Sequence, residues 1–440
     1  MRIPSAADVV VIGGGPAGSL ASTLLTKKGH DVVLFEKQRH PRPQVGESLI
    51  PDFWKYADLM GVTEKLVAEG FLSKAGALIS WDGQYRAHTF SDFGYTRTAL
   101  HVERDRFDQI LFEHAASEGV NVFEETTVRH LEFFVDEETG AEHAIVEVQT
   151  PGDEPTSIRC RYVVDASGQA AVVGRQLGIR RIDDAFRFLS LWGYWDGSRY
   201  LDLDGTAHSE EDLGEVRPVT FLTSIDEAGD SGWAWQIPLR DETSVGLVLP
   251  LDLVKRARRD GESWSDYYER KCREIPILGD LLKGATLRPD SVASIRDYSH
   301  QSTALAGPGW FLAGDASGFV DPIFSVGVVL AMYGAAAAAW ATDRILAHPE
   351  QADWIRDMFS RQLYGRVEVA RSLALPRYRG EEDVTDLARA TLALERSAVK
   401  DIMYAVSEFT TRSDNWLGIV GEEAPNLTAE QRRIITEINL

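Results

Sequence analysis

The most constraining feature of the sequence is a glycine-rich turn close to its start. Residues 13–18 read GGGPAG and satisfy the pattern G-x-G-x-x-G. An apolar run, residues 8–12, precedes the turn, and residues 16–28 have the pattern of a helix that ends at Gly29. A second apolar run follows at residues 31–35. This order predicts a strand–turn–helix–strand unit with parallel strands, whose turn binds the pyrophosphate of a dinucleotide.

Each position of the turn has its own expected role. Gly13 permits the tight turn, Gly15 lets the backbone approach a pyrophosphate, and Gly18 lets the helix pack against the strand. Ala17 lies at the start of the helix, whose free N–H groups face the phosphates. Glu36 follows Gly18 by 18 residues, where a carboxylate can accept both hydroxyls of a ribose. The alternative is an accidental glycine turn with a solvated Glu36, and the complete order of elements disfavours it.

Length, charge and cysteine content narrow the class of protein. At about 150 residues per domain, the 440 residues predict roughly three domains. The formal net charge of −22 disfavours binding to nucleic acid or to anionic membranes. Two cysteines are too few for a disulfide framework and indicate a reducing compartment. No apolar run reaches the roughly 20 residues of a membrane helix, and His88, His101 and His300 lack metal-ligand spacing. We therefore expect a cytoplasmic enzyme without a metal.

Further segments resemble those of the flavin hydroxylase superfamily. Residues 101–108, HVERDRFD, resemble its arginine-bearing helix start, in which Arg104 would contact the cofactor. Residues 163–168, VVDASG, resemble its DG segment, and residues 312–316, LAGDA, resemble its second FAD fingerprint. The resemblance implies that Asp315 binds the ribityl hydroxyls of FAD, and Ser48 and Val128 are further expected cofactor contacts. We also expect residues 297–299 to lie near the flavin.

Dinucleotide-binding features at both ends of the chain indicate that its domains interleave. The fold class is therefore expected to be α/β, with a Rossmann-like FAD-binding domain interleaved with a β-sheet substrate domain. A helical region follows at the C-terminus. The expected boundaries are 1–75, 101–180 and 290–345 for the FAD-binding domain, 76–100 and 181–289 for the sheet-rich substrate domain, and 346–440 for the helical region.

Three more segments resemble the flavin-dependent halogenases. They are residues 46–51, GESLIP; residues 71–77, FLSKAGA, which contain Lys74; and residues 233–238, WAWQIP, which match W-x-W-x-I-P. Residues 321–325, DPIFS, are most similar to the branch that acts on phenols and pyrroles, rather than to the tryptophan halogenases. The resemblance runs from about residue 5 to residue 345 and fades beyond.

The resemblance implies a mechanism centred on Lys74. Reduced FAD, supplied by a separate flavin reductase, would convert O2 and halide into hypohalous acid, which passes through a tunnel to Lys74. The lysine would hydrogen-bond this acid or become a haloamine, and present the halogen to an electron-rich aromatic ring. An ammonium or amine can polarise the halogen–oxygen bond. The alternative is an ordinary surface lysine, which the apolar neighbours Phe71, Leu72 and Ala75 disfavour.

Trp233 and Trp235 lie two residues apart on a predicted strand, so their side chains face the same side. Core packing is one interpretation of the pair. The resemblance implies that the pair, with Ile237 and Pro238, lies along the tunnel and separates the substrate from the flavin.

The expected halide site departs from the family pattern. The family usually has Ser or Thr before the glycine that follows the DP segment, whereas this chain has Val326 before Gly327. If backbone N–H groups at a helix start hold the halide, valine can serve there. If a hydroxyl is required, the site is weakened or changed.

Two other functions remain open from the sequence. One is a monooxygenase or reductase of the same fold that takes hydride from NAD(P)H directly, and the other is a flavin-binding partner or sensor without turnover. Lys74 and the W-x-W-x-I-P segment favour a halogenase. We expect a small free aromatic substrate, closed in by the helical C-terminal region. A carrier-tethered substrate is less favoured, because carrier proteins are typically acidic and this chain has a net charge of −22. The one dense basic cluster late in the chain that could still attract a carrier consists of Arg371, Arg377 and Arg379.

Overall fold

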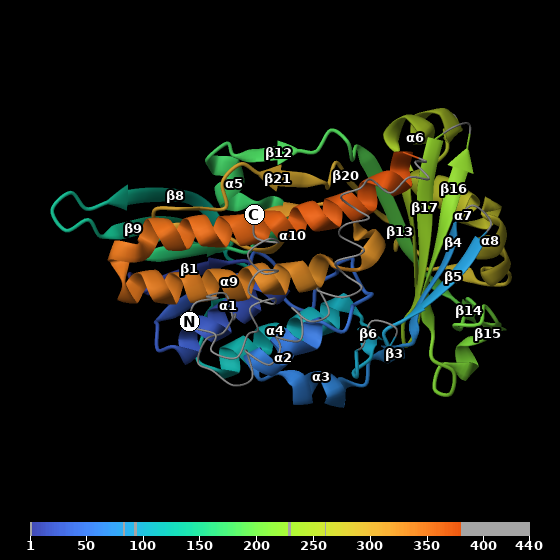
Figure 1. The fold of residues 1–440 in the computed structure, drawn as a ribbon, viewed down its shortest axis with the longest axis horizontal. Coiled ribbons are helices and arrows are strands. Elements are labelled where there is room, and N and C mark those ends of the chain that lie inside the picture. The colour runs from blue at the N-terminus through green and yellow to red at the C-terminus, as the bar shows by residue number, and fades with distance from the viewer. Residues whose placement is uncertain (1, 82–83, 92–94, 228–229, 260, 380–440) are drawn as a thin grey trace, which may run out of the picture.

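A computed structural model describes residues 2–81, 84–91, 95–227, 230–259 and 261–379 (Figure 1). Its first sheet has the strand order β22-β23-β11-β1-β2-β7 and is parallel apart from β22, which pairs antiparallel to β23. Every residue of β1, β2 and β11 is buried, as expected for a parallel sheet covered on both faces. The strands are β1 (Val9–Ile12), β2 (Val32–Phe35), β7 (Asn121–Phe123), β11 (Tyr162–Asp165), β22 (Ala306–Gly307) and β23 (Trp310–Leu312).

Alternate residues of these strands point to opposite faces of the sheet and give it two cores. Val9 and Val11 pack with the helices, and Val10 and Ile12 pack with a small antiparallel sheet. The helices are α1 (Pro16–Lys27), α2 (Phe53–Met60), α4 (Arg104–Ser117), α9 (Gly327–Ala347) and α10 (Ala352–Arg379). The small sheet has the order β10-β9-β8 and contains β8 (Thr127–Val135), β9 (Glu142–Gln149) and β10 (Thr156–Cys160).

A second, eight-stranded sheet stands at one end of the molecule, with α6, α7 and α8 on its outer side (Figure 1). Its order is β19-β13-β18-β17-β16-β4-β5, and β20 pairs with β13. Its strands are β4 (Gly76–Trp81), β5 (Gln84–Thr89), β13 (Phe188–Asp196), β16 (Val219–Glu227), β17 (Asp230–Pro238), β18 (Thr243–Pro250), β19 (Thr286–Leu287) and β20 (Ala293–Arg296). The outer helices are α6 (Leu251–Ala257), α7 (Trp264–Glu274) and α8 (Pro276–Leu281).

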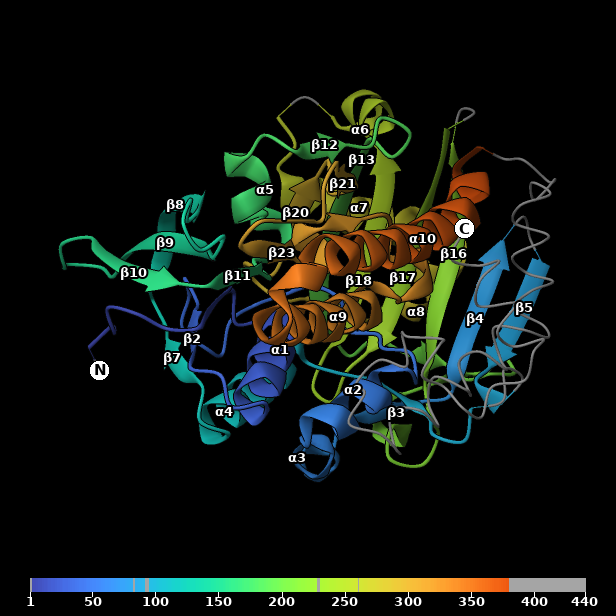
Figure 2. The same cartoon turned by 60° about the vertical axis from the view of Figure 1, so that its left-hand side comes forward.

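Short strand pairs accompany the two large sheets. Strand β3 pairs with β6, β14 with β15, and β21 with both β12 and β24. Helix α10 runs across the molecule toward the eight-stranded sheet (Figure 2). The remaining elements are β3 (Leu72–Lys74), β6 (Ala99–His101), β12 (Arg180–Ile182), β14 (Tyr200–Leu201), β15 (Ala207–His208), β21 (His300–Ser302), β24 (Gly318–Phe319), α3 (Thr63–Glu69) and α5 (Val172–Gln176), with single 3-10 turns at Gly168–Ala170, Glu210–Asp212, Gly314–Ala316, Pro322–Phe324 and Pro349–Gln351.

The predicted α/β fold class is confirmed. Residues 76–101, nearly all of which were assigned to the sheet-rich domain, contain the hairpin of β4 and β5 and the short strand β6. The domain boundaries stay a prediction, and residues 380–440 of the expected helical region lie outside the described residues. In the part of the chain that the structure describes, no helix combines the length and the apolar character needed to cross a bilayer.

Candidate active site

Two glycines of the N-terminal turn are required by the chain's own packing. Gly13 has a φ of +102°, a conformation that favours glycine. A Cβ atom on Gly18 would come within 1.8 Å of the Gly13 carbonyl oxygen, so any side chain there would break the turn. Gly15 differs, because a Cβ atom on it would meet only Arg42 Nη2, at 3.4 Å. Gly15 therefore borders open space, on the side where the pyrophosphate is expected.

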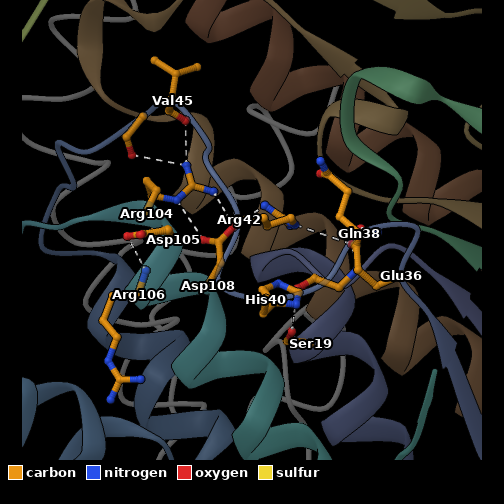
Figure 3. A network of polar contacts seen from close by, with 12 residues as sticks. Ser19, Glu36, Gln38, His40, Arg42, Val45, Arg104, Asp105, Arg106 and Asp108 are labelled. Atoms are coloured by element: carbon orange, nitrogen blue, oxygen red, sulfur yellow. Dashed lines mark hydrogen bonds and ion pairs between the residues drawn. The ribbon is translucent and has the colours of Figure 1, made fainter. Parts of the chain in front are cut away.

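Glu36 lies at the end of β2, beside this turn. Its Oε2 atom accepts a hydrogen bond of 2.7 Å from the Gly14 N–H, and its Oε1 atom accepts one of 2.9 Å from the Gln38 N–H (Figure 3). The side chain is 4% exposed, so it is a fixed acceptor at the edge of the sheet and not a solvated surface group. Val128 is buried on β8, in the core on that side of the sheet. The ribose contact of Glu36 and the cofactor contact of Val128 stay predictions.

An ionic network joins the turn to the start of α4 (Figure 3). Arg42 Nη1 lies 3.2 Å from Asp108 Oδ2, and its Nε lies 3.8 Å from Glu36 Oε2. Arg104 donates to the same Asp108 through Nε at 2.8 Å and Nη2 at 3.1 Å. Arg104 was expected beside the cofactor, whereas Arg42 was not predicted; its only sequence signal is its place between Pro41 and Pro43 in the loop before α2. The two guanidinium groups are held by Asp108 and Glu36, and guanidinium groups are the donors that bind phosphate groups most specifically.

Asp315 lies in the 3-10 turn after β23, at the opposite end of the same sheet edge. Gln169 Nε2 donates to its Oδ2 atom at 3.1 Å. Burial raises the pKa of Asp315, while the hydrogen bond from Gln169 and the charge of Arg104 oppose that rise. A short acceptor in this place suits the hydroxyls of a ribityl chain. The open side of Gly15, the fixed Glu36 and the Asp315 carboxylate together fit FAD.

A cavity joins Asp315 to the predicted halide segment. Asp315, Asp321, Val326 and Gly327 contribute to its lining. Its outer wall comes from α10, through Leu363, Val367 and Ala370. Val326 is the residue before α9, and no side chain caps the N-terminus of this helix. The backbone N–H groups that were expected to bind halide therefore lie beside the cavity.

Substituting Val326 tests how the halide is held. We expect Val326→Ser and Val326→Thr to fold normally and to change the apparent halide affinity by no more than about tenfold, or roughly 1.4 kcal/mol, because backbone N–H groups supply most of the contact. Halide titration of the halogenation rate measures this. A gain well beyond tenfold would mean that the native site lacks a hydroxyl that it needs.

Lys74 is buried on β3 and is not a surface residue. Its side chain is 2% exposed, and Nζ donates to Ser48 Oγ at 2.7 Å and to the Leu49 carbonyl at 3.3 Å. Burial lowers the pKa of Lys74 from 10.5 to about 7. The ammonium also lies 5.4 Å from the centre of the Phe90 ring. Both the ammonium and the free amine are therefore accessible near neutral pH.

Ser48 connects Lys74 to three other segments. Ser325 Oγ donates to Ser48 Oγ at 2.9 Å, so the lysine is two hydrogen bonds from the halide segment. Ser48 Oγ also lies 2.8 Å from Thr220 Oγ1, which lies 2.9 Å from His101 Nε2. Burial holds the pKa of His101 well below 6.5, so the ring is neutral. In one consistent arrangement Lys74 and Ser325 donate to Ser48, Ser48 donates to Thr220, and Thr220 donates to His101.

Sequence reasoning found only part of this network. The cofactor contact of Ser48 stays a prediction, and the structure adds a hydrogen bond from Lys74 that was not predicted. Thr220 was not singled out, and His101 was considered only as a metal ligand and set aside. No local signal identifies them, because 172 residues separate Ser48 from Thr220 and 119 separate Thr220 from His101.

Removing the Ser48 hydroxyl tests its role in positioning Lys74. We expect Ser48→Ala to bind FAD and to lose halogenation about 10- to 100-fold, because the ammonium loses its shortest hydrogen bond. The pKa of Lys74 should then fall further, since a hydrogen bond to the charged form favours that form. The pH–rate profile should therefore move to lower pH, and Ser48→Thr should restore it. An unshifted profile with full activity would contradict this role.

Trp233 and Trp235 lie on the inner side of the eight-stranded sheet, as their spacing predicts. Their ring centres are 5.6 Å apart, and Trp235 Nε1 donates to Ser244 Oγ at 3.2 Å. With Ile237 they form one apolar cluster that includes Val320 and Ile323, on either side of the DP segment. The two tryptophan rings therefore lie between the backbone of the second sheet and the halide segment. The tunnel and the part of Pro238 in it stay predictions.

Comparison with known proteins identifies the family. A family model described as an FAD binding domain matches residues 6–352. The tryptophan 2-halogenase of Chondromyces crocatus is 38% identical over 350 residues, which are 79% of this chain and 63% of that protein. Flavin-dependent halogenase armH3 of Armillaria mellea is 35% identical over 355 residues, which are 77% of this chain and 67% of that protein. The chain belongs to the flavin-dependent halogenase family.

A solved halogenase structure has the same fold as this chain. The myxobacterial chondrochloren halogenase CndH superposes with a TM-score of 0.73 and 27% identity, over 99% of this chain and 96% of the other. The chain spans less than two thirds of the length of the first curated relative that it matches. That relative is named for tryptophan, so the ring on which this halogenase-family chain acts does not follow from the match.

Proposed function

We propose that the chain halogenates an electron-rich aromatic ring, phenol-like or pyrrole-like, using reduced FAD and O2. The observation that carries the proposal is the buried Lys74, which is linked through Ser48 to Ser325 at the halide segment. When bound, reduced FAD would give two electrons to O2 and the halide would give the other two, so that FADH2, O2, halide and a proton yield FAD, hypohalous acid and water. Glu36 and the Gly15 turn would hold the adenosine diphosphate end of the cofactor, and Asp315 would hold its ribityl chain.

Lys74 acts on the halogen. As an ammonium it donates a hydrogen bond to the oxygen of hypohalous acid, which makes the halogen more electrophilic. As an amine it takes the halogen, and the N–H proton leaves with the hydroxyl as water. A pKa of about 7 makes both forms available. Ser48 holds Nζ in place for either step, because it is anchored in turn by Thr220 and Ser325.

The tryptophan pair keeps the substrate away from the flavin cavity. Trp233 and Trp235 are 1% and 5% exposed and pack against the segment that forms the cavity. A ring too large to pass this layer meets the halogen at Lys74 and not at the flavin. This separation favours halogenation over direct hydroxylation of the ring.

We further propose a separate flavin reductase, a cytoplasmic location and a free substrate. The basic cluster considered for a carrier protein is partly neutralised, because Arg371 donates to Asp183 at 2.7 Å. The side chains of Arg377 and Arg379 lie outside the described part of the structure. A carrier would therefore meet less positive charge here than the sequence indicates.

One assay tests these proposals. Purified protein receives FAD, NADH, halide and a phenol, with and without an added flavin reductase, and mass spectrometry detects halogenated product. We expect product only with the reductase, on the free phenol. NADH consumption by the protein alone would favour the monooxygenase or reductase alternative, and flavin binding without any turnover would favour a sensor. Product only from a carrier-loaded ring would overturn the free-substrate proposal.

A further inference from the structure

Two half-buried cations lie together on α2 and α10. The Arg366 guanidinium carbon lies 3.9 Å from the centre of the Tyr333 ring, and Lys55 Nζ lies 5.7 Å from the centre of the Tyr56 ring. The two positive charges repel each other. Burial and the charge of Arg366 both lower the pKa of Lys55, to about 8. Among the described residues no carboxylate lies within 4 Å of either group. The charge of Asp52 acts on both cations, and the Tyr95 hydroxyl donates to Asp52 at 2.5 Å.

This arrangement differs from that of other partly buried arginines in the chain. Arg356, Arg371 and Arg270 lie 2.9 Å, 2.7 Å and 2.8 Å from carboxylates of Glu142, Asp183 and Glu262. Two like charges that are partly removed from water, without a close counter-charge, carry a desolvation cost that an anion would offset. In a chain with 68 acidic and 46 basic residues, unpaired cations are not explained by a shortage of acids.

An aromatic surface leads from these cations to Lys74. The Lys74 ammonium lies 5.4 Å from the centre of the Phe90 ring, and the Phe90 and Tyr95 rings are 6.5 Å apart in an edge-on arrangement. Tyr95 in turn contacts Asp52, the residue before α2, and Lys55 lies in the first turn of that helix. Both rings are half-buried. An aromatic substrate that lay along them would reach Lys74 at one end and the two cations at the other.

We propose that Lys55 and Arg366 bind the carboxylate of an aromatic acid, whose ring packs on Phe90 and Tyr95 and is halogenated at Lys74. The planar guanidinium suits a carboxylate because it offers two parallel N–H donors. The length of the aromatic surface requires a carboxylate several bonds from the reacting carbon. The inference rests on the proposed function, to which it adds the charge and shape of the substrate.

The experiment measures binding separately from turnover. Isothermal titration calorimetry with the FAD-loaded protein compares 3-(4-hydroxyphenyl)propionate with its neutral primary amide. We expect the acid to bind at least about tenfold more tightly than the amide. Arg366→Gln and Lys55→Met should each weaken binding of the acid about tenfold and change binding of the amide less than about twofold. The control is Arg361→Gln, which removes an exposed arginine of the same helix that is paired with Asp357.

The outcomes separate this inference from the proposed function. Equal affinities for acid and amide in the native protein, or no measurable binding of the acid, would overturn it. An equal loss of both ligands in Arg366→Gln would overturn it too, because it would mean that Arg366 only packs on Tyr333. If the protein halogenates the amide and binds the acid no more tightly than the amide, the proposed function stands and the anion site is excluded. Acid-selective binding without product from any probe supports the anion site and contradicts the proposed function.

Discussion

Lys74→Met should abolish halogenated product, by at least about a thousandfold, while the protein still binds FAD. Methionine matches the length of the lysine side chain but offers neither a donor for hypohalous acid nor a nitrogen that can take the halogen. Lys74 lies on β3. The residues expected to bind the cofactor, Gly15, Glu36 and Asp315, lie on other segments, so cofactor binding should persist. Product is measured by mass spectrometry, and flavin binding by absorbance. Lys283→Met, at an exposed lysine that is paired with Asp280, is the control.

The same substitution should make the protein more stable near and below neutral pH, by about 1–3 kcal/mol, because it replaces a buried cation with an apolar group. The pKa of Lys74 is about 7 in the folded state and 10.5 ordinarily. Between these values the unfolded chain binds a proton that the folded chain does not, so the native protein loses stability as the pH falls from 10.5 to 7. The advantage of Lys74→Met should therefore be greatest below pH 7 and shrink toward pH 10. A gain in the free energy of unfolding that does not depend on pH, or a large loss of stability, would contradict the conclusion that Lys74 is a buried cation.

Gly15→Trp should remove FAD binding, by more than about a hundredfold, without unfolding the protein. Gly15 has extended backbone angles, with φ −80° and ψ −172°, that any residue adopts, and its side faces open space. An indole placed there would fill the position expected for the pyrophosphate. Gly18→Ala is the matched comparison, because its methyl group meets the Gly13 carbonyl at 1.8 Å and must deform the turn. We expect Gly18→Ala to lose both cofactor and stability.

Flavin fluorescence titration and thermal unfolding followed by circular dichroism separate the two cases. A folded Gly15→Trp protein with normal flavin affinity would show that the pyrophosphate lies elsewhere. A Gly18→Ala protein as stable as the native one would show that the helix and turn can move apart, contrary to their packing here.

Local sequence patterns were sufficient for the FAD-binding half of the fold. The spacing of apolar residues in 8–35 encodes β1, α1 and β2, because burial on both faces leaves a parallel strand no polar positions. Residues 327–347 are similarly apolar and form α9. The individual strands within residues 76–100 were not predicted, because β5, at the edge of the sheet, consists of polar and aromatic residues without a regular apolar alternation.

The environment of Lys74 could not be predicted in the same way. Its apolar flanking residues indicated burial, yet its partner Ser48 comes from a loop 26 residues earlier. Thr220 reaches the network because β16 pairs in parallel with β4, at a register that no local pattern encodes. The anion-binding pair is similar: Lys55 and Arg366 are separated by more than 300 residues and meet only because α2 and α10 both pack on α9.

Ion pairs hold α10 near both of its ends. Arg356 pairs with Glu142 beside the parallel sheet, and Arg371 pairs with Asp183 near the second sheet. Between these two points it provides the outer wall of the cavity and carries Arg366. The match to the family model ends at residue 352, where this helix begins. The residues proposed to bind flavin and to act on the halogen thus lie in the matched part of the chain, and one wall of the cavity lies beyond it. Substitutions in that wall can therefore change the shape of the cavity while the residues proposed for the oxidative chemistry stay unchanged.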